Sequence, residues 1–229
     1  MLGNSSKQTL WDDFVSAHAI VQCSVPLFSI NSGCVDVFPY GRDKRLVLKR
    51  SGEMELLMRR LGQQLINEFR QKAIMHDGIL YLMFRREEDA VIPLYFGKAE
   101  ILGKGEANLS ANISDLTTGD GKFGRWGYNY AYHIGDLSAV TLPGHPDDKQ
   151  TRKYDDWRRS LFLKQADLLT TNGDIRFWAC LWGPEQQSIW SEFGTTRLAF
   201  EEYLLIGIAS ELFPNDLLNR EGRNRLGTI

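Results

Sequence analysis

The sequence predicts an α/β (α+β) fold in which a small mixed, mainly antiparallel three-stranded sheet is flanked by helices. Three observations support this prediction: a helical repeat of apolar residues, a pair of short apolar strands, and a further apolar strand downstream. They lie at Met54–Phe69, at 78–84 with 91–97, and at Ile175–Trp182. Apolar residues spaced three and four apart indicate a helix, whereas short apolar runs between turn residues indicate strands.

The length of the chain allows one large domain with an extension. With 229 residues it can bury a sizeable core. We expect an N-terminal helical extension over residues 1–75 and one domain over residues 76–229. This domain would carry an insertion at about residues 105–170, after the second strand of the sheet.

In the N-terminal third, two helices frame an irregular stretch. The first helix is expected from about Lys7 to Ile20, and the stretch that follows to Ser51 contains Val25-Pro26 and Phe38-Pro39. The residue before a proline favours extended or turn backbone, so we expect no long helix there. The second helix follows with the apolar stripe that begins at Met54.

The remaining elements follow in order. A charged turn, Arg85–Asp89, separates the first two strands and predicts an antiparallel hairpin. Residues 128–142 fit either a strand or a helix, and a helix is expected from about Asp155 to Leu169. The last helix is expected to start after Gly194, with Thr195 or Thr196 as N-cap, and to end before Pro214.

The charge of the chain is close to balanced, with a formal net charge of -2. Proteins that bind nucleic acid usually carry a basic surplus, so this value argues mildly against that class. The charge is uneven, however: residues 42–72 contain nine Lys or Arg and four acidic residues, and three Arg follow position 219. A local basic field is what phosphate contacts require.

Cysteine use and hydropathy point to a cytoplasmic protein. Three cysteines without CxxC spacing fit neither a disulfide framework nor a zinc site. The N-terminus shows no basic and apolar leader, and the longest apolar run, Tyr203–Ala209, is far shorter than the ~18 residues of a membrane span. We therefore expect no membrane partner.

The predicted hairpin carries the clearest motif. Its first strand opens with Gly78-Ile79-Leu80-Tyr81, and its second strand ends with Leu94-Tyr95-Phe96-Gly97-Lys98-Ala99. This pattern resembles the hallmark of GIY-YIG nucleases, in which one strand opens with Gly-Ile-Tyr and its partner carries Tyr-Ile-Gly followed by Lys. The resemblance implies that Tyr81 is the general base, that Tyr95 orients the phosphate, and that Gly97 and Lys98 contact the substrate.

Two elements near the C-terminus extend the resemblance. Glu202-Tyr203-Leu204-Leu205-Ile206 is similar to the E-x-x-L-I helix of the family, whose glutamate holds one divalent metal ion, Mg²⁺ or Mn²⁺. Asn219 is similar to the closing asparagine that supports the phosphate. Glu201 is an alternative to Glu202, and Asn215 is an alternative to Asn219.

The family also uses an arginine beyond the second tyrosine, which is absent from residues 100–106. The restriction-enzyme branch inserts sequence before an Arg-x-x-x-His stretch, so the resemblance assigns this role to Arg125 and a supporting role to His133. Further basic residues near the motifs are expected to contact the phosphate backbone: Lys104, Arg220 and Arg223.

The resemblance implies a metal-dependent DNA endonuclease of the restriction or phage-defence type, with DNA and a second copy of the chain as partners. A neutral tyrosine is a weak base, because its pKa near ~10 leaves roughly 0.1% ionised at neutral pH. Cationic neighbours are expected to offset this deficit. The alternative is a GIY-YIG-like scaffold without activity that binds DNA or protein.

Overall fold

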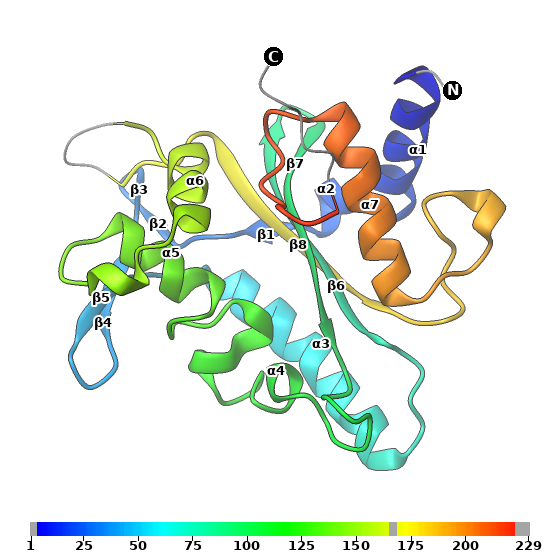
Figure 1. Cartoon of the computed structure of the whole chain (residues 1–229), viewed down its shortest axis with the longest axis horizontal. Coiled ribbons are helices and arrows are strands. Elements are labelled where there is room, and N and C mark those ends of the chain that lie inside the picture. The colour runs from blue at the N-terminus through cyan, green and yellow to red at the C-terminus, as the bar shows by residue number, and fades with distance from the viewer. Residues whose placement is uncertain (1–3, 165–168, 223–229) are drawn as a thin grey trace.

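A four-stranded antiparallel sheet lies at the centre of the structure, a computed structural model that describes residues 4–164 and 169–222. The strands in spatial order are β1 (Val25–Pro26), β8 (Asp174–Trp182), β6 (Gly78–Glu87) and β7 (Ala90–Glu100) (Figure 1). The combination of helices and strands is confirmed. The sheet itself differs from the prediction, because it has four strands instead of three and every pairing is antiparallel.

The β6–β7 hairpin is longer than the sequence indicated. Glu87 pairs with Ala90, so the turn is only Glu88-Asp89, and Glu88 has the positive φ of 55° that such a tight turn requires. The charged residues from Arg85 to Glu87 therefore continue β6 instead of forming a turn. Further along the hairpin Tyr81 lies directly opposite Gly97.

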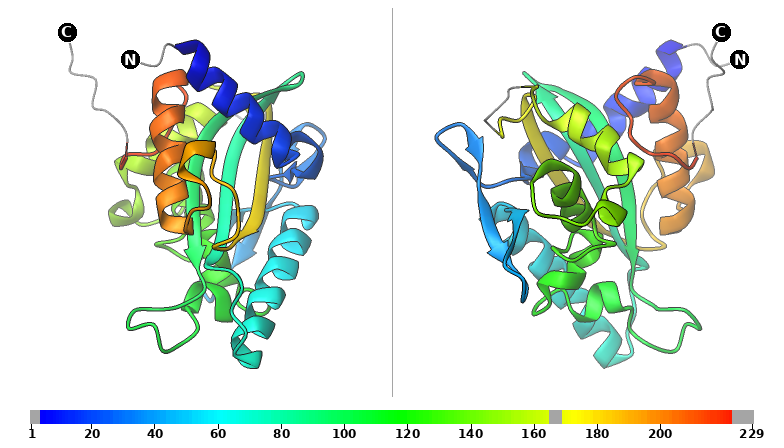
Figure 2. Two further views of the ribbon diagram at one scale, coloured as in Figure 1. Left: turned by 90° about the vertical axis from the view of Figure 1, so that its right-hand side faces the viewer. Right: turned by 60° about the vertical axis from the view of Figure 1, so that its left-hand side comes forward.

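The two faces of the sheet are covered by different helices. Alternate residues of β6 point to opposite faces, as they must in a strand: Ile79, Tyr81 and Met83 join one apolar cluster, whereas their even-numbered neighbours join the other. The first face is covered by α3 (Gly52–Gln71), α4 (Ala111–Ser114), η1 (Asp120–Arg125), α5 (His133–Thr141) and α6 (Arg152–Leu161). The second face is covered by α1 (Asn4–Ala17), α2 (Ile20–Cys23) and α7 (Leu198–Leu212), and Figure 2 shows α1 and α7 together on that side.

The N-terminal segment is more than a helical extension. β1 adds a strand to the central sheet, and two small hairpins pair β2 (Ile30–Asn31) with β3 (Cys34–Val35) and β4 (Val37–Tyr40) with β5 (Arg45–Leu48). Because α1 and α3 cover opposite faces of the sheet, both apolar clusters contain residues from the N-terminal segment and from the rest of the chain.

Several helix limits differ from the sequence prediction for local reasons. α1 ends at Ala17, before Ala19 adopts a left-handed φ of 45°. α6 begins at Arg152 and ends at Leu161, short of the predicted Leu169, and residues 165–168 of that prediction lie outside the described residues. Residues 128–142 contain a helix, α5, and no strand.

α3 and α7 begin in different ways. The Ser51 side chain accepts a hydrogen bond from the Met54 backbone N–H and caps α3, in the manner expected of a helix start. The N-cap of α7 is Arg197 instead of Thr195 or Thr196. Two short helical turns complete the description, η2 (Asp147–Lys149) and η3 (Ser191–Phe193).

Candidate active site

The hydroxyl of Tyr81 lies in the space left by the missing side chain of Gly97. A Cβ built at position 97 would lie 2.5 Å from Tyr81 Oη and 2.6 Å from two of its ring carbons. Tyr81 itself is buried, with 2% of its surface exposed. The Tyr81 side chain therefore fits only if position 97 on β7 has no side chain, which explains why that position requires glycine.

His133 joins Tyr81 to a residue that the sequence did not point out. Its Nε2 lies 3.5 Å from Tyr81 Oη, and its Nδ1 lies 2.9 Å from the hydroxyl oxygen of Tyr154 on α6. Burial, followed by the charges of Lys153 and Arg125, holds the pKa of His133 well below its usual value. The imidazole is therefore neutral at physiological pH and connects two buried tyrosines.

Tyr95 lines the same site but is only partly buried. Its ring centroid lies 4.7 Å from that of Trp157, 5.1 Å from that of His133 and 6.5 Å from that of Tyr81. Burial raises the pKa of Tyr95 to about 12, with a further increase from the Glu202 carboxylate and an opposing decrease from Arg125. Neither Tyr95 nor Tyr81, whose pKa burial raises even further, is ionised near neutral pH.

Arg125 approaches the site from the end of η1. It is exposed and has a positive φ of 74°, so its backbone is held in an unusual conformation. Its positive charge lowers the pKa of Tyr81, Tyr95 and His133. In the two tyrosines this opposes the larger increase that burial causes, and in His133 it adds to the larger decrease that burial causes. The predicted replacement arginine thus acts electrostatically on three of the predicted site residues.

The two candidate glutamates of α7, Glu201 and Glu202, have separate environments. Glu201 is fully buried, and its carboxylate accepts hydrogen bonds from the Ile189 backbone N–H at 2.8 Å and from the Thr196 hydroxyl at 2.7 Å. This carboxylate holds the loop before α7. Glu202 is half-buried, and its charge raises the pKa of both Tyr81 and Tyr95.

The pKa of Glu202 is raised to about 7. Burial is the main cause, Lys98 opposes it, and the carboxylates of Glu100 and Glu221 add to the increase. A half-buried carboxylate with acidic neighbours is stabilised by a bound cation. Glu202 therefore fits the single-carboxylate metal site that the resemblance implies.

No cluster of three or more His, Cys, Asp or Glu side chains able to hold a metal ion occurs within the described parts of the chain. Mg²⁺ needs less than such a cluster, since it commonly retains several water ligands and takes only one or two carboxylates. Glu202 alone, with Glu100 nearby, matches this donor set.

Asn219 stabilises strand β7 beside the site. Its Oδ1 accepts from the Phe96 backbone N–H and its Nδ2 donates to the Phe96 carbonyl, both at 2.9 Å. The preceding Leu218 N–H donates to the Leu94 carbonyl at 2.7 Å. The C-terminal segment therefore lies along the free edge of β7, next to Tyr95, whereas Asn215 is exposed.

Several of the basic residues that were predicted to contact the phosphate backbone form ion pairs or line pockets near β7. Lys98 pairs with Glu100, and Arg220 pairs with Asp156 at 2.7 Å. Lys98 and Arg125 line a pocket of about 320 Å³, together with Ser110. Arg223, also predicted to contact substrate, lies outside the described residues.

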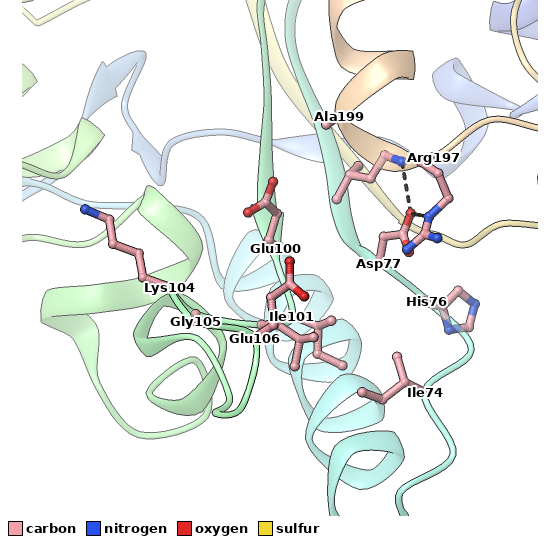
Figure 3. A pocket seen from close by; sticks show the side chains of 13 residues that line it. Ile74, His76, Asp77, Glu100, Ile101, Lys104, Gly105, Glu106, Arg197 and Ala199 are labelled. Carbon is pink, nitrogen blue, oxygen red and sulfur yellow. Dashed lines mark hydrogen bonds and ion pairs between the residues drawn. The ribbon is translucent and has the colours of Figure 1, made fainter.

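A second pocket, of about 550 Å³, lies on the other side of the segment that follows β7. Figure 3 shows the exposed Lys104 pointing away from the ion pair between Arg197 and Asp77. The two pockets share Glu100, Leu102 and Gly103 as lining residues, so they adjoin at the end of β7.

The sequence missed the contribution of α6. Lys153, Tyr154 and Trp157 of this helix surround Tyr95 and His133. Tyr154 and Trp157 are three residues apart, a spacing that fits one helix face, but nothing in the sequence predicted which distant residues that face would contact.

Comparisons of the chain with protein-family models, with curated proteins and with solved structures find no match. Across residues 4–164 and 169–222, none of the helices has the length and apolar character needed to cross a membrane.

Proposed function

We propose that this chain is a divalent-metal-dependent DNA endonuclease of the GIY-YIG type, which hydrolyses phosphodiester bonds. The observation that carries the proposal is the packing of Tyr81, Tyr95 and His133 against one another, with the charges of Arg125 and Glu202 both acting on the two tyrosines. These residues come from five separate elements, and the sequence motifs had selected all of them.

The site lies where the two layers of the molecule meet. Tyr81 faces the side of the sheet that carries the insertion, whereas Glu202 belongs to α7 on the opposite side. The Glu202 charge nevertheless raises the pKa of Tyr81, whose hydroxyl lies against the backbone of Gly97 on β7. Ionisable groups with shifted pKa values that come together from distant segments are typical of enzyme sites.

Each residue has a chemical role that its surroundings support. With a hydrogen on Nδ1, neutral His133 donates to Tyr154 and accepts at Nε2, so the Tyr81 hydroxyl can pass its proton to His133 while it takes one from an attacking water. Arg125 neutralises negative charge that develops on the phosphate. Tyr95, whose hydroxyl remains protonated, donates a hydrogen bond that orients the phosphate.

A metal ion held by Glu202 would supply Lewis-acid stabilisation to the phosphate and the leaving oxygen. Lys98 opposes the high pKa of Glu202 and so favours the ionised carboxylate that such an ion requires.

Cleavage of supercoiled and linear DNA in the presence of Mg²⁺ or Mn²⁺ tests the proposal. The wild-type chain should cut, whereas Tyr95→Phe and Glu202→Gln should lose at least about a hundredfold in rate, as removal of one group that stabilises a transition state commonly does. Tyr203→Phe is a matched control because Tyr203 is exposed on the same helix. Glu202→Gln should also abolish the rise in melting temperature that Mg²⁺ gives the wild type.

An inactive module that binds DNA or protein remains the alternative, and the deep burial of the Tyr81 hydroxyl favours it. Retained DNA binding without cleavage in either metal ion would support this alternative and contradict the nuclease.

The proposed function includes a role in restriction or phage defence. It also includes a homodimer that cuts both strands of the DNA. Light scattering of the active enzyme tests the dimer.

A further inference from the structure

Lys153 is a cation within the candidate site that the sequence motifs did not select. It lies near the start of α6, in the insertion, and its Nζ is 5.1 Å from the ring centroid of Tyr154 and 5.2 Å from that of Tyr95. The ring of Trp157 lies 5.5 Å away on the same helix. Three aromatic rings thus surround the half-buried ammonium group.

Within the described parts of the chain Lys153 forms no ion pair with a carboxylate, in contrast to Lys98, Lys122 and Lys149. The charges that act on the ammonium group of Lys153 include two other cations, Arg125 and Arg220. Burial, then Arg125 and then Arg220 lower the pKa of Lys153, and Asp136 and Glu221 oppose them only in part.

An unpaired ammonium in a partly dry environment destabilises a folded protein. The aromatic rings offset some of this cost through cation–π attraction. A negatively charged ligand would offset the remainder, and the place for it is beside Tyr95, where Lys153 and Arg125 both act.

We propose that Lys153 binds a phosphate group of the DNA backbone, with its ammonium group contacting a non-bridging oxygen next to Tyr95. This inference rests on the proposed function of the same site and names a residue that contacts the substrate. A lysine ammonium serves as a compact point charge for phosphate. The insertion thereby contributes directly to substrate binding, in addition to covering the sheet.

Affinity for a short DNA duplex in EDTA, where a metal-dependent nuclease does not cut, measures the contact. Lys153→Met should bind about tenfold more weakly, the effect of losing one hydrogen bond to a charged group. The slope of log affinity against log salt should fall by about one, since one phosphate contact is lost. Lys153→Arg should retain most of the affinity because it keeps the positive charge.

Lys149→Met is the matched control. It removes the same charge from the neighbouring η2, where Lys149 is paired with Asp148 at 2.6 Å, and should leave affinity and salt slope unchanged. Lys153→Met should also melt at the same or a higher temperature than the wild type, because it removes a half-buried unpaired charge. This stability readout separates lost binding from lost fold.

A second measurement needs no variant. Acetylation of lysines in the wild-type chain, followed by mass spectrometry, should show that bound DNA protects Lys153 and leaves Lys149 accessible. Wild-type affinity and slope in Lys153→Met, or modification of Lys153 unaffected by DNA, would overturn the inference even if the enzyme cuts. Binding that depends on Lys153 without any cleavage would support the inference and contradict the nuclease. A chain that binds no DNA would contradict both.

Discussion

Tyr81 occupies the volume that any side chain at position 97 would require, and this contact links the two halves of the hairpin motif. The resemblance to the family hairpin selected both residues, but the sequence did not predict that they lie opposite each other. That register depends on the shorter turn and on the bulge between Met83 and Phe84. The sequence also left Glu201 and Glu202 undecided, since adjacent helix residues differ only by the direction in which they point. Packing of α7 separates them: Glu201 is buried against the preceding loop, whereas Glu202 is half-buried and its charge raises the pKa of both tyrosines.

Gly97→Ala tests the steric fit between the two strands. The added methyl would lie 2.5 Å from Tyr81 Oη, so the strand or the tyrosine must move. We expect a loss of about 1–3 kcal/mol in the free energy of unfolding, the usual cost of overpacking, together with loss of DNA cleavage. Urea denaturation measures the first effect, and the cleavage assay measures the second.

Gly207→Ala is the control for this change. Gly207 lies inside α7 and a Cβ there would meet nothing within 4 Å. Alanine is the better helix former by roughly 0.5–1 kcal/mol, so this variant should be more stable than the wild type and equally active. An active Gly97→Ala variant of unchanged stability would show that the Tyr81–Gly97 contact is looser than the structure indicates.

At the scale of elements, the insertion depends on one buried arginine for its position. The Arg50 guanidinium donates to Glu55 at 2.5 Å and to the Trp126 carbonyl at 2.5 Å, and it is stacked between the rings of Phe123 and Tyr128. It is 1% exposed. Arg50 therefore fixes the segment around η1, which carries the exposed Arg125 next to the tyrosines.

Arg50→Met should consequently affect both stability and the site. The change removes the buried guanidinium from Glu55 and from the Trp126 carbonyl, although Glu55 keeps Arg59 and Tyr128 as partners. We expect a loss of about 2–3 kcal/mol in the free energy of unfolding. Amide hydrogens of residues 120–128 should exchange faster with solvent in the variant, as mass spectrometry can measure. Arg42→Met, at an exposed position in the same basic stretch, should have neither effect. Unchanged exchange in Arg50→Met would refute the positioning role.

How far the sequence predicted each element depends on where its stabilising contacts lie. α3, the hairpin and β8 carry their own periodic apolar pattern, and the structure confirms all three. β1 has only two residues, Val25 and Pro26, and exists through its pairing with β8. Strands this short have no recognisable pattern of their own, because tertiary contacts decide their conformation.

At the scale of the whole molecule, a balanced net charge of -2 coexists with a site rich in cations. Arg125 and Arg220 both lower the pKa of Lys153, which lies over the Tyr95 ring, although the three cations are distant in sequence. Composition could not predict this local surplus, since it arises from folding. Burial, together with the charges of Lys153 and Arg125, also keeps His133 neutral, and this gives the global stability a dependence on pH.

The lowered pKa of His133 determines the direction in which its contribution to stability changes with pH. Its pKa is well below 6.5 in the folded chain because of burial, Lys153 and Arg125, whereas the unfolded chain binds the proton at its ordinary pKa. Above about pH 6.5 both states are neutral at this residue, and below it only the unfolded state gains a proton. The contribution of His133 to the free energy of unfolding should therefore decrease as pH falls below 6.5, by at most ~1.4 kcal/mol per pH unit for one proton.

Comparison of the wild type with His133→Gln isolates this residue from the other titrating groups, including Glu202, which acts in the opposite direction because its pKa is raised. Glutamine can still bond to the Tyr81 hydroxyl but does not titrate. The difference in unfolding free energy between the two proteins should be constant from pH 7.5 to 9 and should shift in favour of the variant between pH 6.5 and 5. Urea denaturation at each pH measures it. A difference that stays flat down to pH 5 would mean that His133 accepts a proton in the folded chain, and Tyr81 would then have a charged partner instead of the neutral acceptor on which the proposed proton transfer depends.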